Sequence, residues 1–356
     1  MIGDKLSIFS TAFALVAILV YTEDDSVFSM IPEIHNKMEN ATMQKMFVTM
    51  AFGLFLLTGV ILAQDKAAFQ LSDLVEPDAK AIALGAGYGF SEGPAADAVG
   101  NIYFSDGAKD TIHFYAYGRQ VEVFVDDSLD ANGMMFNRNG NLVSVEGAAF
   151  HIVEFNMRTK EKRILAKGID GKRFNEPNDL AIDFENGFYF SDPNYRHRGQ
   201  ETSMKEDVYY VSKDGEVTRV STVCKTPNGV LLSADCKTLY VGDNGGTNIY
   251  QYDVLGPGKL ANERVFINDA PGSDGMTLDA ENNLYVTCGG RGIKIYDKAG
   301  KHIGTLGTDY GIPYASNCVF GGPNFSILYV TSRDQFLGIP MKVQGMLPPC
   351  AGIRIP

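Results

Sequence analysis

From about residue 80 onward, hydrophobic and polar positions alternate with a period of two, the pattern typical of β-strands. The stretch that begins at Met276 predicts four short strands, at Met276–Leu278, Leu284–Thr287, Gly292–Tyr296 and Lys301–Thr305. Turn residues at 279–282 and 297–300 separate them. No sustained 3.6-residue pattern follows Ala63, so the body of the chain is expected to be all-β.

This four-strand unit repeats along the chain. Similar rhythms occur at 133–166 and 230–267, and six segments align: SEGPAADAVGNIYFSD, ANGMMFNRNGNLVSVE, PNDLAIDFENGFYFSD, PNGVLLSADCKTLYVGD, SDGMTLDAENNLYVTC and SNCVFGGPNFSILYVTS. Their second residues, at 92, 132, 178, 228, 274 and 317, are 40 to 50 positions apart. Repeats of this length with four antiparallel strands predict a six-bladed β-propeller.

The repeat also sets the expected domain boundaries. Residues 64–356 are predicted to form one propeller domain, although the length of 356 residues alone would suggest two domains. The sixth segment shows only three good strands. We therefore expect Ala81–Leu84 to supply its outer strand and close the ring.

The first 63 residues have a different pattern. Lys45 and Met46 open an apolar run, Phe47 to Ala63, that ends in Ile61-Leu-Ala63 before polar Gln64. This favours a secretory signal cleaved after Ala63, with Met43 or Met46 as the true start and a secreted or periplasmic product. The alternative is a membrane anchor formed by residues 47–63; once the signal is cleaved, no stable membrane partner is expected.

The composition narrows the choice of partner. The chain has 31 Lys and Arg against 43 Asp and Glu, a net charge of −12, and −9 remains without residues 1–63. Such acidity argues against nucleic acid as a partner and leaves small molecules. The five cysteines, Cys224, Cys236, Cys288, Cys318 and Cys350, show no CxxC or CxxH spacing, so a zinc site is not expected, while export would permit a disulfide. The oligomeric state is left open.

The six aligned positions carry the candidate chemistry. They are Glu92, Asn132, Asn178, Asn228, Asp274 and Asn317, each at the start of a predicted innermost strand. Because innermost strands line the central channel of a propeller, these oxygen-bearing side chains are expected to converge. Carboxylate and amide oxygens are ligands that Ca²⁺ prefers. A polar channel without a metal is the alternative interpretation.

At these residues the chain resembles the gluconolactonase, regucalcin and luciferin-regenerating enzyme family of six-bladed propellers. The motifs SEGP, PNDL, PNGV and SDGM carry the resemblance, which spans about residues 80–340. It implies that Glu92, Asn178, Asn228 and Asp274 bind a catalytic divalent cation, with Ca²⁺ expected and another divalent cation as a substitute. It also implies that Asp274, or alternatively Glu92, acts as the base.

Four further residues are candidates for substrate contact. Asp192 and Tyr195 lie in SDPNY, which is similar to a stretch of bacterial gluconolactonases, and both are expected at the rim of the site. Asn132 is expected near the substrate because of its place in the second blade. His151 is considered as a proton shuttle. Glu176 stands where the resemblance implies an arginine, two residues before the third-blade Asn178, so the resemblance does not extend to a sugar-lactone specificity like that of animal regucalcin.

The sequence thus predicts a Ca²⁺-dependent hydrolase that opens a sugar lactone or a similar cyclic ester. A bound cation would polarise the carbonyl, and a carboxylate would move the proton. Two alternatives are a non-catalytic binding propeller stabilised by its metal and a promiscuous phosphotriesterase.

Overall fold

The structure is a computed structural model that describes residues 69–196 and 205–349. The chain divides into two units, residues 1–68 and 69–356, of which only the second contains described residues. The predictions for residues 1–63, namely the signal, the alternative anchor and the start at Met43 or Met46, lie outside the described residues. Within the described ranges, no helix is long and apolar enough to span a bilayer.

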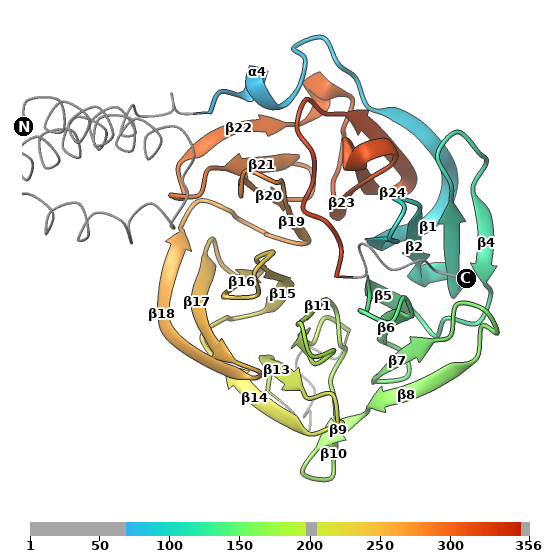
Figure 1. The fold of residues 1–356 in the computed structure, drawn as a ribbon, viewed down its shortest axis with the longest axis vertical. Helices are drawn as coiled ribbons and strands as arrows, with labels where there is room; N and C mark the ends of the chain where they lie inside the picture. The colour runs from blue at the N-terminus through green and yellow to red at the C-terminus, as the bar shows by residue number, and fades with distance from the viewer. Residues whose placement is uncertain (1–68, 197–204, 350–356) are drawn as a thin grey trace, which may run out of the picture. The chain divides into compact units, whose positions relative to one another are not determined.

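Antiparallel sheets arranged in a ring make up the second unit (Figure 1). Four of them have four strands each and correspond to the second to fifth repeats. The strands of the second and third blades are β5 (Ala131–Phe136), β6 (Leu142–Glu146), β7 (His151–Phe155), β8 (Lys162–Ala166), β11 (Leu180–Ile182), β12 (Phe188–Asp192), β13 (Asp207–Val211) and β14 (Val217–Ser221). Those of the fourth and fifth are β15 (Pro227–Leu232), β16 (Thr238–Asp243), β17 (Ile249–Gly256), β18 (Lys259–Ile267), β19 (Met276–Leu278), β20 (Leu284–Thr287), β21 (Ile293–Tyr296) and β22 (His302–Leu306).

A six-stranded sheet joins the first and sixth blades. It contains β1 (Ile82–Ala96), β2 (Ile102–Asp106), β3 (Thr111–Tyr115), β4 (Glu122–Val125), β23 (Asn317–Gly321) and β24 (Ile327–Pro340). The first half of β1 pairs with β24, with Ile82 opposite Gly338, and its second half pairs with β2. The prediction that residues near Ala81–Leu84 close the ring is therefore confirmed.

The strand β24 is folded back on itself. Arg333 has a φ of +56°, and the rings of Tyr329 and Phe336 on either side of it stack with centroids 5.6 Å apart. An extended strand would separate these rings by about 23 Å, at about 3.3 Å per residue. Because β24 thus supplies two strands, with β23 and the first half of β1 on either side, the sixth blade has four strands and the propeller has six blades.

Short connections between the strands are fixed by side-chain caps. The carboxylate of Asp97 accepts the N–H groups of Val99 and Asn101, both at 2.9 Å. Equivalent pairs of hydrogen bonds are made after the inner strands of the second, third and fifth blades by Asn137, Asp183 and Asp279. Asx turns of this kind explain why the repeat keeps Asp or Asn at this position.

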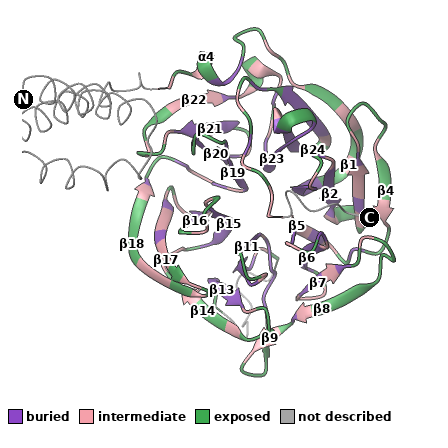
Figure 2. Cartoon of the chain, viewed as in Figure 1, coloured by how far each residue is buried: buried purple, intermediate pink, exposed green. Residues whose placement is uncertain are grey.

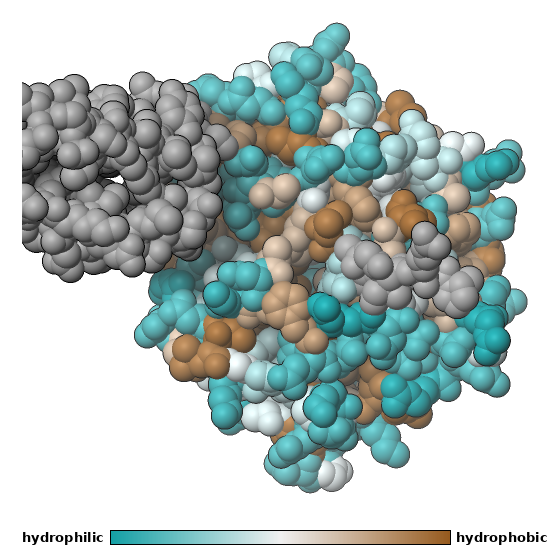
Figure 3. Space-filling model, viewed as in Figure 1, coloured by the Kyte–Doolittle hydropathy of each residue, from teal (hydrophilic) through white to brown (hydrophobic). Residues whose placement is uncertain are grey.

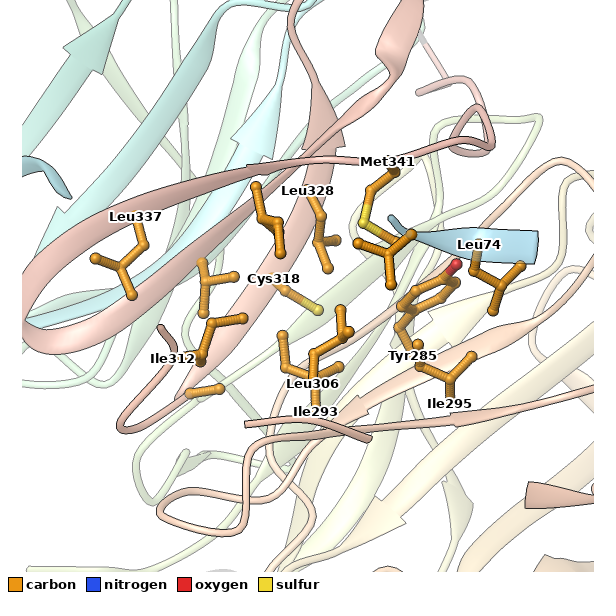
Figure 4. Close-up of a cluster of buried hydrophobic side chains, with 14 of the residues drawn as sticks. Leu74, Tyr285, Ile293, Ile295, Leu306, Ile312, Cys318, Leu328, Leu337 and Met341 are labelled. Atoms are coloured by element: carbon orange, nitrogen blue, oxygen red, sulfur yellow. The ribbon is translucent and has the colours of Figure 1, made fainter. Parts of the chain in front are cut away.

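Apolar side chains between neighbouring blades form the core. Inner strands are buried on both faces, whereas the outer strands β4, β8, β14 and β18 are largely exposed or half-buried (Figure 2). Figure 4 shows the cluster between the fifth and sixth blades, where Tyr285, Ile293 and Leu306 meet Cys318 and Leu328. On the face drawn in Figure 3, hydrophobic side chains lie in small groups among hydrophilic ones.

Segments outside the repeats complete the unit. The short helix α4 (Leu71–Leu74) packs Leu74 into the cluster of Figure 4. A two-stranded hairpin, β9 (Gly168–Ile169) and β10 (Lys172–Arg173), precedes the third blade. The 3₁₀ turns η2 (Gly107–Lys109), η3 (Thr308–Tyr310) and η4 (Pro323–Phe325) lie between strands of the described part of the chain.

The chain after β24 closes one end of the central channel. The N–H of Met346 donates to the carbonyl of Leu278 at 2.9 Å, and that of Gly345 donates to the carbonyl of Phe325 at 2.8 Å. Met346, Pro348 and Pro349 line a small internal space together with residues of the inner strands. This segment therefore covers the end of the channel at which inner strands such as β19 finish, and the inner strands begin at the other end.

Glycine at the start of an inner strand permits close contact between blades. Gly93 has a φ of +43°, and a Cβ on it would lie 1.8 Å from the carbonyl oxygen of Asn132 in the second blade. Likewise, a Cβ on Gly229 would lie 2.1 Å from the carbonyl oxygen of Asp274. The backbones that carry the candidate site residues thus pack directly on one another.

We expect Gly93→Ala to lower the free energy of unfolding by about 2 kcal/mol or more, because the added methyl group cannot fit against a backbone carbonyl. Gly256→Ala is the matched control, because its Cβ would meet nothing within 4 Å, and it should change stability by less than about 0.5 kcal/mol. Urea denaturation of both variants measures the difference, and equal effects would contradict the contact described here.

Candidate functional site

A cavity of about 670 Å³ lies where the inner strands begin. Its lining comes from all six blades and consists of Phe90, Glu92, Gly107, Ala108, Asp130, Ala131, Asn132, Asn178, Tyr195, Arg196, Asn228, Asn244, Asp274 and Tyr314. The structure therefore brings together Glu92, Asn178, Asn228 and Asp274, the four residues predicted to bind a metal. Asn132 and Tyr195 also line this cavity.

The first two strands of each blade hold these residues in place. The N–H of Asn178 donates to the carbonyl of Ser191 at 3.0 Å, and that of Asp274 donates to the carbonyl of Thr287 at 2.9 Å. Both carbonyls belong to the second strand of the respective blade. The site residues are thus extensions of the sheet ladders, and their backbones are fixed by the same hydrogen bonds as the blades.

Burial and the repulsion by neighbouring acidic groups disfavour the simultaneous ionisation of Glu92 and Asp274. Burial raises the pKa of Glu92 to about 8, and the charge of Asp179 adds to this rise, while the Gly93 N–H and the Asn317 amide oppose it. The pKa of Asp274 is raised well above its ordinary value by burial and then by the charges of Glu92 and Asp179. Without a cation, the pair therefore retains a proton near neutral pH.

The amide of Asn228 links the carboxylate to the cavity wall. Its Nδ2 donates to the hydroxyl oxygen of Tyr195 at 2.7 Å, and its amide also donates to the carboxylate of Asp274. With both N–H bonds of the amide engaged in this way, its carbonyl oxygen is left as an acceptor. Asn228 can therefore orient Asp274 and still offer an oxygen to a cation.

Asp179 is a third acidic side chain near the axis that the sequence comparison of repeats did not single out. Its carboxylate accepts the N–H of Leu180 at 2.9 Å and the N–H of Val230 in the next blade at 3.0 Å. Burial raises its pKa to about 7. The signal was present in the sequence, because the third repeat reads PND where the second, fourth and fifth repeats have Gly at the third position.

Tyr195 reaches the cavity because Glu176 holds its loop. The carboxylate of Glu176 accepts the N–H of Tyr195 at 2.9 Å and the N–H of Arg196 at 3.0 Å. Glu176 itself is buried. Glu176 thus positions part of the cavity wall.

Asp192 lies away from the rim at which it was expected. It is fully buried, and its Oδ2 accepts the N–H of Asn175 at 2.8 Å. Asp106 and Asp243, which end the second strands of the first and fourth blades, also accept backbone N–H groups from the segment before the inner strand. Asp192 is therefore the third-blade member of a repeated structural contact and does not line the cavity.

His151 also lies outside the cavity lining. Its Nε2 is 2.6 Å from Oε2 of the buried Glu146, whose Oε1 is 2.9 Å from Nζ of Lys162. This arrangement ties together the ends of β6, β7 and β8 in the second blade. It gives His151 a structural partner at the place where a proton shuttle was considered.

The donor set fits a hard divalent cation. Two carboxylates and two carboxamides face one cavity, and a cation between the carboxylates would remove the repulsion that raises the pKa of Asp274. No group of three or more His, Cys, Asp or Glu side chains suited to a metal occurs in residues 69–196 and 205–349. The candidate ligand set is instead made of two carboxylates and two carboxamides. The free thiols in the described residues take no part in it; they are Cys224, Cys236, Cys288 and Cys318.

The raised pKa of Glu92 predicts how stability changes with pH in cation-free protein. The folded chain holds a proton on Glu92 up to about pH 8, whereas an ordinary Glu loses it near pH 4.5. The free energy of unfolding should therefore fall as pH rises from about 4.5 to about 8, because only the unfolded state releases this proton.

Urea denaturation in chelator across this pH range measures the slope. Glu92→Gln should flatten it, since the amide does not titrate, whereas Glu185→Gln, at an exposed turn position, should leave it unchanged. An identical slope in the wild type and Glu92→Gln would contradict this assignment.

The sequence of this chain is similar to those of known propeller lactonases and regucalcins. Residues 90–334 match the family model described as the SMP-30/Gluconolactonase/LRE-like region. A gluconolactonase of Zymomonas mobilis is 29% identical over 287 residues, which are 72% of this chain and 80% of that protein. A regucalcin of Xenopus laevis is 30% identical over 202 residues, 55% of this chain and 66% of that protein.

Among solved structures, a gluconolactonase from Xanthomonas campestris is similar with a TM-score of 0.69 and 25% identity, covering 76% of this chain and 92% of that one. The family model covers most of the propeller, from the residue before the first inner strand to the turn of β24. The chain therefore belongs to the SMP-30/gluconolactonase/LRE-like family.

Proposed function

We propose that this chain is a lactonase that opens a cyclic ester with the help of a divalent cation, expected to be Ca²⁺. The observation that carries the proposal is the convergence of Glu92, Asn178, Asn228 and Asp274 on one cavity. The gluconolactonase relatives from Zymomonas mobilis and Xanthomonas campestris support the substrate class, since the chain matches 80% and 92% of their lengths.

The four residues would hold the cation through oxygen atoms alone. Ca²⁺ prefers such ligands and tolerates the irregular geometry that four different blades provide. When bound, a divalent cation supplies Lewis acidity to the lactone carbonyl. Glu92 and Asp274 together balance its charge, so both can then be ionised at neutral pH.

Asp274 is the better placed of the two carboxylates to act as the base. It is partly exposed to the cavity, and the Asn228 amide orients it. Glu92 is more deeply buried, and its Oε2 already accepts the Gly93 N–H at 2.9 Å. We therefore assign proton transfer to Asp274 and binding to Glu92, with Glu92 as the alternative base.

The reaction needs one water molecule and one relayed proton. Asp274 takes a proton from the water molecule while the oxygen of that water bonds to the lactone carbonyl carbon. The bond from that carbon to the ring oxygen then breaks, and Asp274 returns the proton to the departing ring oxygen. The product is an open hydroxy acid. Tyr195 and Asn132 line the path and would orient the substrate through their polar groups.

We expect the purified protein to hydrolyse gluconolactone and to lose this activity in excess chelator, with recovery on adding Ca²⁺. Asp274→Asn should reduce kcat at least about 100-fold, since it removes the base and keeps the shape of the side chain. Glu185→Gln, outside the cavity, is the matched control and should keep wild-type rates. A pH-stat or coupled indicator assay measures hydrolysis.

Calorimetric titration with Ca²⁺ separates catalysis from binding. Tight binding of Ca²⁺ without turnover of any lactone would favour a non-catalytic binding propeller. Full activity in excess chelator would contradict the metal-dependent mechanism. Turnover of phosphotriesters in preference to lactones would support the third candidate, a phosphotriesterase.

A further inference from the structure

The cavity contains an ion pair that the proposed chemistry does not use. Asp130 and Arg196 both line the cavity, and Nη2 of Arg196 bonds Oδ2 of Asp130. The side chain of Asp130 is 17% exposed and that of Arg196 is 53% exposed. The pair bridges the second and third blades, because Asp130 precedes β5 and Arg196 follows β12.

Asp130 is held in an unusual backbone conformation. Leu129 and Asp130 have φ values of +48° and +59°, a region that residues with a Cβ rarely adopt. The Asp130 N–H donates to Oδ1 of Asp110 at 2.7 Å, and the Asp130 carbonyl accepts the Gly147 N–H at 3.0 Å. Consecutive strained residues held by specific contacts are more common at functional sites than in ordinary connections.

Neighbouring glycines leave room for the Asp130 carboxylate. A Cβ on Gly107 would lie 2.5 Å from Oδ1 of Asp130, and a Cβ on Gly147 would lie 3.0 Å from Oδ2. Gly107 itself lines the cavity. The first and second blades therefore both accommodate this carboxylate at the cavity wall.

The backbone of Arg196 is also held in place by hydrogen bonds, in the third blade. The buried carboxylate of Glu176 accepts the N–H groups of Tyr195 and Arg196, which fixes the backbone from which the guanidinium extends. Only part of the donor capacity of the guanidinium is used by Asp130, because arginine carries five N–H bonds. The pair thus presents N–H donors and a carboxylate acceptor side by side.

Aromatic side chains line the cavity at the junction of the sixth and first blades. The rings of Phe90 and Tyr314 meet edge to face with centroids 6.3 Å apart, and both line the cavity. The guanidinium of Arg333 lies 4.3 Å from the centroid of the Tyr314 ring. These rings offer an apolar surface to a ring-shaped ligand whose other edge is polar.

Charge indicates which ligand the ion pair suits. The charged side chains of the lining are Glu92, Asp130, Asp274 and Arg196. With a divalent cation present, their charges and that of the cation sum to zero. An anionic ligand gains no net attraction from this balance, because the repulsion by Asp130 offsets the attraction by Arg196. Hydroxyl groups both donate and accept hydrogen bonds, so they match the mixed donors and acceptors of the pair.

We propose that Asp130 and Arg196 determine substrate specificity by binding the hydroxyl groups of a neutral, polyhydroxylated lactone. This inference rests on the proposed lactonase function and adds the residues that select the substrate. Asp130 accepts hydrogen bonds from substrate hydroxyls, and Arg196 donates to them. Lactones without hydroxyl groups can still enter the cavity and react, but they form no hydrogen bonds with Asp130 and Arg196.

The test compares three lactones: gluconolactone, δ-valerolactone without hydroxyl groups, and a glucarolactone that carries a carboxylate. The wild-type kcat/KM is expected to be highest for gluconolactone. In Asp130→Asn and in Arg196→Gln, the ratio of kcat/KM for gluconolactone to that for δ-valerolactone should fall at least about tenfold, chiefly through KM. Turnover of δ-valerolactone shows that each variant is folded.

Arg219→Gln is the matched control, because Arg219 pairs with Asp207 at 3.3 Å away from the cavity lining. It should keep the wild-type ratio. An unchanged ratio in the two cavity variants, or a wild-type preference for the glucarolactone, would overturn the specificity proposal alone. Failure of the wild type to hydrolyse any of the three lactones would contradict the proposed function itself.

Discussion

The repulsion between two carboxylates at the cavity, those of Glu92 and Asp274, is the interaction on which the rest of the site depends. Burial raises the pKa of both groups, and neighbouring acidic charges add to it, that of Asp179 for Glu92 and those of Glu92 and Asp179 for Asp274, so the cation-free pair holds a proton that ordinary carboxylates would release. Placing two such groups together destabilises the fold unless something of opposite charge lies between them. A divalent cation would resolve this conflict, and in the function proposed above the same cation would supply Lewis acidity for ester hydrolysis.

The ring keeps the carboxylates together despite their repulsion. Glu92 lies on β1, whose first half completes the sixth blade and whose second half begins the first blade. Closure of the propeller and placement of Glu92 are therefore functions of one strand. Gly93 and Gly229 allow the neighbouring blades to approach until their backbones touch, which brings the side chains from different blades to one cavity.

Much of this arrangement could be predicted from the sequence because it repeats. The period of two predicted the strands, and the six aligned segments predicted the blades. Five of the six residues at the inner-strand starts line one cavity, whereas Asn317 lines the internal space near Met346. Residues whose roles depend on contacts outside the strand pattern were harder to interpret. Asp192 looked like a rim residue, yet it holds a backbone segment just as Asp106 and Asp243 do in their blades.

Other features leave only a weak trace in the sequence. Asp179 departs from the glycine found in other repeats, but its bond to Val230 joins residues 51 positions apart. Asp130 and Arg196 belong to irregular segments 66 residues apart, and no periodic pattern connects them. The contact of His151 with Glu146 is local, but nothing in a single sequence separates a structural histidine from a proton shuttle. The sequence patterns therefore located the strands, whereas the roles of individual polar side chains became clear only from their contacts in the folded structure.

The most direct test of this account is the number of protons released when Ca²⁺ binds near pH 7, measured by calorimetry in buffers of different ionisation enthalpy. Since Glu92 has a pKa of about 8 without a cation, binding should release roughly one proton per ion, and Glu92→Gln should reduce this release. Binding of Ca²⁺ to the wild type without proton release would contradict a carboxylate pair that only a cation can fully ionise.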